Sequence, residues 1–160
     1  MKLKVLALSL VIAFMSSCGD SKKGNEAAPK EKEEVIKEVV VDPMQDKGIG
    51  PITSISLGEI DDSLVVTGEE LFKSKCSACH KITKRFVGPP LAGVTERRTP
   101  EWIMNMILNP EIMVEKNAEA KKLLAEYLSP MANQSLTEAE ARAILEYFRT
   151  KTSTSNDSAE

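Results

Sequence analysis

The chain has 160 residues, of which 42% are hydrophobic, 28% are charged and only 4% are aromatic, and its formal net charge is −3. This length allows one small domain with a tail, and the charge balance argues against a nucleic-acid-binding protein. The chain has three cysteines and one histidine. Histidine-based catalysis would therefore have to depend on His80 alone, and a zinc site would lack ligands.

The N-terminus has the pattern of an export signal. Two lysines begin it, residues 3–15 are almost wholly apolar, and small residues precede Cys18. This apolar run is too short to span a bilayer comfortably. A cysteine at this place resembles that of a bacterial lipoprotein, which is lipidated and becomes the first residue of the mature chain. We therefore expect residues 1–17 to be a cleaved lipoprotein signal peptide and Cys18 to carry a lipid; ordinary secretion with an unmodified Cys18 is the alternative.

A charged tether is predicted over residues 18–62. Residues 19–62 contain eleven acidic residues, six lysines and no aromatic residue, so burial cannot offset the entropy lost on ordering them. Residues 19–41 are therefore predicted to be disordered. Residues 49–60 differ, because their isoleucine and leucine residues are spaced along the segment. This spacing predicts an extended strap that lies on the folded domain.

The folded domain is predicted to span residues 63–150 and to be all-α, with residues 151–160 as a disordered tail. Apolar residues recur at helical spacing, and no convincing strand alternation is found. Pro110 is expected to end the second helix. The four predicted helices cover residues 67–76, 100–109, 120–127 and 138–148.

Capping patterns set the starts of two of these helices. Thr67 with Glu70, and Thr137 with Glu140, have the spacing of a capping box. These pairs predict the starts of the first and the last helix.

The sequence Cys76-Ser77-Ala78-Cys79-His80 has the spacing of a c-type haem attachment motif. Two thiols about one helical turn apart can form thioethers with the two vinyl groups of a porphyrin. The histidine that follows then presents its imidazole to the iron. We therefore expect Cys76 and Cys79 to hold one covalent haem c, with His80 as an iron ligand.

Other interpretations of this motif are weaker. A disulfide oxidoreductase with a CxxC pair normally carries a βαβ pattern, which is absent here. A zinc site would need ligands that the chain lacks beyond Cys18. A chance match does not explain why the motif follows a capped amphipathic helix in an exported chain.

The chain resembles the small class I monohaem cytochromes c over residues 66–150. This resemblance implies the cytochrome c fold, with about four short helices around one haem and with the first and last helices crossing closely. Gly68 would allow the close approach, and Phe72 would meet Ile144 or Tyr147 at the crossing. The resemblance rests on Gly68, Phe72, CSACH at 76–80, GPPL at 88–91, Met131 and the terminal ARAILEYFRT.

The resemblance also implies roles for residues around the haem. Pro89 would accept a hydrogen bond from His80 and so orient its ring. Met131, in the loop before the last helix, would be the sixth iron ligand, with Met113 as the alternative. Trp102 would pack on the haem and donate its indole N–H to a propionate, or would be a core residue only.

Methionine–histidine ligation leaves no open iron site and raises the reduction potential. The expected function is therefore one-electron transfer and not catalysis, by a cytochrome tethered on the periplasmic side of a bacterial membrane. A quinol-oxidising complex is the expected donor and a terminal oxidase or reductase the expected acceptor. Nitrous oxide reductase is one candidate, because the strap and ERRTPEWIMNMILNP resemble small cytochromes that accompany such enzymes. The alternative is a gas sensor or ligand-binding lipoprotein with an open or labile sixth site.

Basic residues surround the predicted haem motif. Such charges usually serve solvation, but a cluster at a haem edge in a neutral domain favours docking on an acidic partner. The cluster consists of Lys73, Lys75, Lys81, Lys84 and Arg85, with Arg97 and Arg98 further along the chain.

Overall fold

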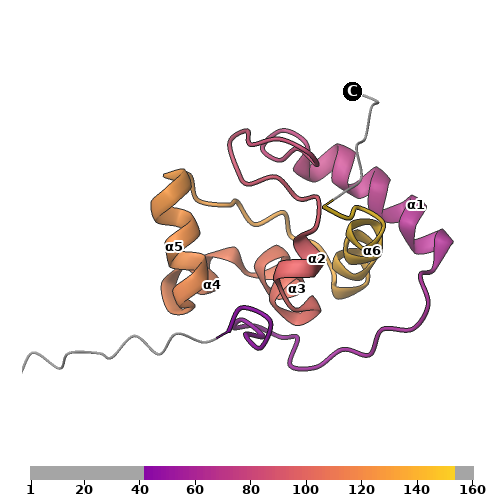
Figure 1. The fold of residues 1–160 in the computed structure, drawn as a ribbon, viewed down its shortest axis with the longest axis horizontal. Coiled ribbons are helices and arrows are strands. Elements are labelled where there is room, and N and C mark those ends of the chain that lie inside the picture. The colour runs from indigo at the N-terminus through magenta and orange to yellow at the C-terminus, as the bar shows by residue number, and fades with distance from the viewer. Residues whose placement is uncertain (1–41, 154–160) are drawn as a thin grey trace, which may run out of the picture. The chain divides into compact units, whose positions relative to one another are not determined.

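The computed structural model describes residues 42–153. The predictions for the signal peptide, Cys18 and the first part of the tether lie outside the described residues, as does most of the predicted tail. Within the described part the chain is helical and has no strand (Figure 1), which confirms the predicted all-α class. The elements are α1 (Asp62–Leu71), a π-helical turn η1 (Phe72–Cys76), α2 (Val94–Arg97), α3 (Pro100–Leu108), α4 (Pro110–Lys116), α5 (Ala118–Tyr127) and α6 (Glu138–Arg149).

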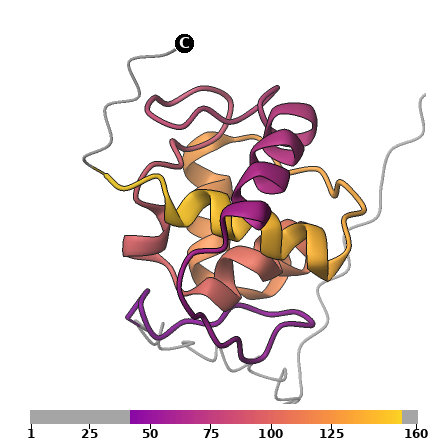
Figure 2. The same cartoon turned by 90° about the vertical axis from the view of Figure 1, so that its right-hand side faces the viewer.

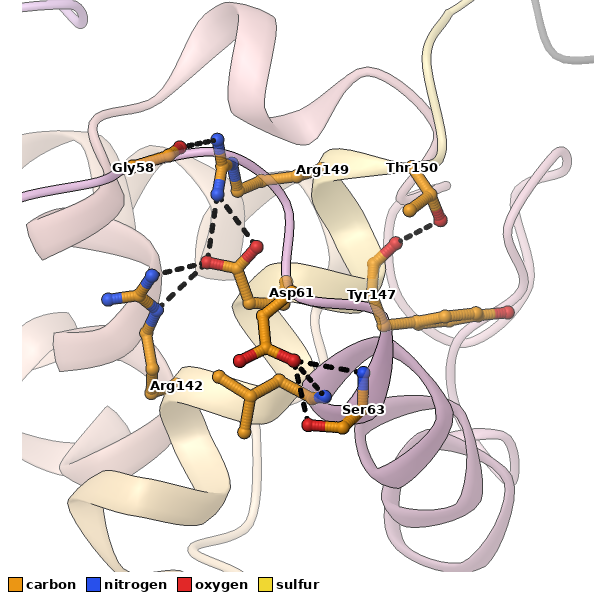
Figure 3. A network of polar contacts seen from close by, with 9 residues as sticks. Gly58, Asp61, Ser63, Arg142, Tyr147, Arg149 and Thr150 are labelled. Carbon is orange, nitrogen blue, oxygen red and sulfur yellow. Dashed lines mark hydrogen bonds and ion pairs between the residues drawn. The ribbon is translucent and has the colours of Figure 1, made fainter.

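Helix α1 begins five residues earlier than predicted. The carboxylate of Asp61 accepts hydrogen bonds from the backbone N–H groups of Ser63 at 2.9 Å and Leu64 at 3.2 Å, as Figure 3 shows. Aspartate is among the strongest N-cap residues, so the helix starts there. Thr67 lies inside α1 and donates its hydroxyl to the carbonyl of Ser63. The predicted start at Thr67 is wrong.

Helix α6 begins where the sequence predicted. The backbone N–H of Glu140 donates to the hydroxyl of Thr137 at 3.2 Å, and the N–H of Thr137 donates to the Glu140 carboxylate at 2.8 Å. This reciprocal pair is the predicted capping box. The inner face of α6 is buried and includes Ala141, Ile144, Leu145, Tyr147 and Phe148.

Helices α1 and α6 cross in close contact (Figure 2). A Cβ atom at Gly68 would overlap the backbone carbonyl of Ala143, so only glycine fits at this position. The ring of Phe72 lies 5.5 Å from that of Tyr147 and 5.9 Å from that of Phe148, measured between centroids. The predicted meeting of Phe72 with Tyr147 is confirmed.

Helices α2 and α4 were not predicted. Asn109 is both the C-terminal cap of α3 and the residue before α4, and Pro110 occupies the first position of α4. Proline ends one helix because it lacks an N–H, and it begins the next because its φ is already helical. Helix α2 has only four residues, too few to show a periodic pattern.

Residues 42–61 form a strap that begins with a turn at residues 43–45, includes the predicted segment 49–60, passes α3 and reaches the start of α1 (Figure 1). Ile52, Ile55 and Leu57 are partly buried and pack against the hydrophobic core. Ile60, which belonged to the same predicted apolar set, is 43% exposed. The strap backbone is also hydrogen-bonded by polar side chains of α3 and its C-cap, which the apolar spacing alone did not indicate.

An ion-pair network on α6 holds the end of the strap. Glu146 is fully buried and pairs with Arg142 and with Arg149, the latter at 2.7 Å. Arg149 also donates to the backbone carbonyl of Gly58 at 2.8 Å (Figure 3). Two arginines thus balance one buried carboxylate, as a buried charge requires. One of them also binds the strap.

A helix can cross a membrane only if it is long and apolar enough to span the bilayer. Among the helices of residues 42–153, none is long and apolar enough to cross a bilayer.

Candidate cofactor site

A cavity of about 240 Å³ lies among α3, α5, α6 and the loops that follow η1 and α5. Most of its lining is apolar, and three helices supply a large part of it. Their lining side chains are Trp102, Ile103, Met106 and Ile107 of α3, Ala120, Leu123, Leu124 and Tyr127 of α5, and Ile144 and Phe148 of α6.

The residues of the CxxCH motif form one side of this cavity. The π-helical turn η1 ends at Cys76, and the N–H groups of Cys79 and His80 both donate to the carbonyl of Cys76, at 3.0 and 2.9 Å. This tight turn brings both thiols and the imidazole to the cavity. Cys76 is partly buried and Cys79 is exposed, so one edge of the site is accessible from the surface. Single π-helical turns often occur at functional sites.

His80 has a defined orientation and a free ring nitrogen. Its Nδ1 lies 3.1 Å from the carbonyl oxygen of Pro89. A carbonyl can only accept, so Nδ1 carries the proton and donates, which leaves Nε2 with a lone pair for a metal ion. Burial lowers the pKa of His80, and the bond to Pro89 opposes this shift. The imidazole is therefore favoured in the neutral form that metal ligation requires. The carbonyl of Pro89 thus lies within hydrogen-bond distance of His80, as expected from the resemblance.

Gly88 packs directly on the His80 ring. A Cβ atom at this position would overlap the Cε1 and Nδ1 atoms of the imidazole. Its N–H donates to the carbonyl of Cys79 at 2.9 Å, so the loop is closed over the motif. The sequence placed Gly88 only within GPPL, and its contact with the His80 ring appears only in the structure.

The thiol of Cys76 is not prepared for redox exchange. Burial raises its pKa to about 11, and the neighbouring Cys79 adds to this shift. Reactive cysteines of disulfide oxidoreductases have lowered pKa values, because the thiolate is the nucleophile. This environment disfavours the thiol–disulfide interpretation.

The structure separates the two candidate methionines. Met131 is partly buried and lines the cavity, in the loop between α5 and α6. Met113 is fully buried, and its sulfur accepts the N–H of Ile49 at 3.1 Å beneath the strap. Met106 of α3 also lines the cavity.

Trp102 lines the cavity and is 4% exposed, but its indole N–H is already used. It donates to the side-chain oxygen of Asn117 at 3.2 Å. The indole therefore has a partner within the protein, Asn117 at the start of α5, and the bond to a propionate stays a prediction. Arg97 and Arg98 also line the cavity, whereas the sequence had placed them in an outer basic cluster.

Part of the basic cluster is neutralised by neighbouring carboxylates. Arg85 pairs with Glu126 at 3.0 Å, and Arg98 pairs with Glu119 at 2.9 Å. Lys73 pairs with the glutamate one turn before it at 2.8 Å. The positive surface near the motif is therefore weaker than the sequence suggested.

Comparison with known proteins agrees with this geometry. The family model described as cytochrome c matches residues 65–152. The chain belongs to the cytochrome c family. A solved structure of cytochrome c from Rhodothermus marinus is 48% identical, covers 63% of this chain and 88% of its own, and has a TM-score of 0.62.

Two engineered forms of the Rhodothermus marinus protein are also similar to this cytochrome c. One is 47% identical, covers 63% of this chain and 89% of its own, and has a TM-score of 0.62. The other, bound to a carbene intermediate, is 48% identical, covers 63% of this chain and 88% of its own, and has a TM-score of 0.59. Among curated proteins, none matches the chain.

Family membership establishes haem c as the cofactor. The residues present fit it, because a CxxCH turn brings two thiols and a correctly polarised imidazole to an apolar cavity. Proteins of this family are haem proteins that generally carry electrons and are typically found outside the cytoplasm.

Proposed function

We propose that this cytochrome c is a one-electron carrier in which Cys76 and Cys79 hold the haem and His80 and Met131 are the axial ligands. The observation that carries the proposal is the hydrogen bond from His80 Nδ1 to Pro89, which turns the metal-binding nitrogen away from the loop in a cavity that Met131 also lines. When bound, the haem supplies a one-electron iron couple.

The cavity residues suit electron transfer more than substrate binding. The apolar walls would disfavour the extra charge of an oxidised haem iron held here, which would raise its reduction potential. The Pro89 carbonyl holds the proximal ring in place, so little rearrangement accompanies a change of charge. A thioether from Met131 would close the remaining axial position against small molecules.

Replacing Met131 by alanine tests the ligand. We expect the weak far-red absorption band of methionine-ligated ferric haem to disappear, and the iron to become high-spin and to bind carbon monoxide readily when reduced. Met106→Ala is the matched control, because Met106 lines the same cavity, and it should keep the band. A wild-type protein that binds carbon monoxide as fast as Met131→Ala would instead support the gas-sensor alternative.

We further propose that the protein is exported and anchored through Cys18 to the periplasmic side of a bacterial membrane. The lipoprotein-like signal and the charged segment 19–41 before the strap support this proposal. There it would carry electrons from a quinol-oxidising complex to a terminal oxidase or a reductase such as nitrous oxide reductase. Metabolic labelling with a fatty acid should mark the wild type and not Cys18→Ser, and release of both from membranes by salt alone would contradict the anchor.

A further inference from the structure

Helix α3 separates the strap from the cavity. Three polar residues spaced four apart bind the strap, namely Glu101 and Asn105 of α3 and its C-cap Asn109. Asn105 is 1% exposed. Its side-chain amide donates to the backbone carbonyl of Ile52 at 2.9 Å and accepts the backbone N–H of Ile52 at 3.0 Å. Apolar residues of the same helix line the cavity. A displacement of the strap would therefore act on a helix that forms the cofactor site.

Asp46 of the strap makes a second connection, which reaches beyond α3. Its carboxylate accepts the side-chain amide of Asn117 at 2.8 and 3.1 Å, and its backbone carbonyl accepts the hydroxyl of Thr99 at 2.5 Å. Thr99 is the N-cap of α3 and Asn117 is the N-cap of α5. One strap residue therefore binds the caps of both helices.

The amide of Asn117 can take only one orientation in this network. An ionised carboxylate only accepts hydrogen bonds, so the NH₂ group must face Asp46. The oxygen of the amide then faces the N–H of Ala120 at 2.9 Å and the indole N–H of Trp102 at 3.2 Å. Asn117 is 7% exposed, so water competes little for these bonds. The carboxylate of Asp46 thereby holds the NH₂ group of the amide whose oxygen accepts the indole N–H of Trp102.

We propose that Asp46 is a positioning residue for the haem site. Through Asn117 it holds Trp102 and the first turn of α5, and α5 leads directly into the loop that carries Met131. This inference depends on the proposed function for the identity of the sixth ligand. The strap is then a part of the cofactor site. Its residue Asp46 supports the loop from which the Met131 thioether would bind the iron.

Hydrogen exchange of the indole N–H tests the connection in the full-length holoprotein. Trp102 is the only tryptophan, so its indole gives a single assignable NMR signal. In Asp46→Ala we expect this proton to exchange about tenfold faster, because a buried amide has lost its partner. The control is Asp42→Ala, since Asp42 lies on the same strap and, within residues 42–153, its carboxylate accepts a hydrogen bond only from the nearby N–H of Met44. This variant should exchange like the wild type.

Carbon monoxide binding to the reduced holoprotein tests the consequence at the iron. We expect Asp46→Ala to bind carbon monoxide about tenfold faster than Asp42→Ala and to show a weaker methionine–iron band. Asp46→Asn keeps one acceptor oxygen for Asn117 and should restore most of both properties. If Asp46→Ala speeds indole exchange but leaves carbon monoxide binding unchanged, Asp46 has only a structural role. If indole exchange is also unchanged, Asp46 is not coupled to Trp102 through Asn117.

Two results keep this inference distinct from the proposed function. If Asp46→Ala yields no folded holoprotein, the comparison is made with Asp46→Ser, which also removes the carboxylate, and an indole exchange rate and carbon monoxide rate equal to those of Asp42→Ala overturn the inference. If the wild type shows no methionine–iron band, the proposed Met131 ligand fails. The inference then depends on whether the Soret circular dichroism of Asp46→Ala departs from that of Asp42→Ala, and identical spectra overturn it.

Discussion

At the cofactor site, a glycine packs directly against the ring of the histidine that is expected to bind the iron. Gly88 lies so close to the imidazole of His80 that no side chain fits between them. The same loop supplies the Pro89 carbonyl that selects the protonated ring nitrogen. At the scale of single residues, the site therefore depends on one absent side chain as well as on the ligands.

Gly88→Ala should disturb the proximal ligand. The added methyl group overlaps the ring, so either the imidazole or the loop must shift, at a cost of about 1–3 kcal/mol. We expect a lower denaturation midpoint and a changed Soret spectrum. Gly58→Ala is the control, because a Cβ atom at Gly58 meets no atom within 4 Å. Equal stability of the two variants would contradict the close packing on His80.

At the scale of elements, the crossing of α1 and α6 organises the fold. Gly68→Ala places a Cβ atom against the backbone of Ala143, which cannot rotate away as a flexible side chain could. Alanine gains about 1 kcal/mol in helix propensity, but separating the two helices should outweigh this gain. We expect a net loss of about 2 kcal/mol in chemical denaturation. A Gly68→Ala protein as stable as the wild type would mean that the helices do not cross this closely.

The capping box of α6 makes stability depend on pH. Bonds from the backbone N–H and hydroxyl of Thr137 lower the pKa of Glu140. A lowered carboxyl pKa stabilises the folded state above the unfolded pKa of about 4.3, and this contribution is lost as the pH falls through the lower folded value.

Variants of this box separate its two parts. Thr137→Ala removes the hydroxyl cap and should cost about 1 kcal/mol at pH 7. Glu140→Gln should lose stability at pH 7 and show a smaller fall than the wild type between pH 5 and pH 3. The measurement is urea unfolding of the holoprotein at each pH. A wild-type profile that matches Glu140→Gln throughout would contradict the contribution of the carboxylate.

At the scale of the whole molecule, we propose that the loop beside the haem motif is a docking surface for a redox partner. Phe86 and Val87 are 53% and 40% exposed, and Val87 also lines the cavity. The amine of Lys81 lies 5.6 Å from the centre of the Phe86 ring. Exposed apolar residues with cations around them suit a partner that combines an apolar centre with acidic side chains.

Oxidation of the reduced protein by the anionic probe ferricyanide tests this surface. Lys84→Glu reverses a charge on the loop and should slow the reaction about threefold at low ionic strength, with the difference vanishing in high salt. Lys116→Glu makes the same change in net charge at the end of α4. If both variants slow the reaction equally, net charge alone is responsible and the loop is not a specific docking surface.

The sequence by itself determined the chemistry and the helical class. A haem attachment motif depends on thiols and an imidazole at fixed spacing along one turn, and a capping box depends on neighbours three residues apart, so both are local. The start of α1 was misjudged because two local caps competed, and the aspartate at position 61 took precedence.

Only the tertiary structure decided which distant residues serve the site. It placed Met131 at the cavity and Met113 under the strap, and it joined the indole of Trp102 to Asn117. These choices depend on which faces of α3 and α5 meet the strap and which meet the cavity. Packing between segments some fifty residues or more apart sets those faces, and no local pattern encodes it.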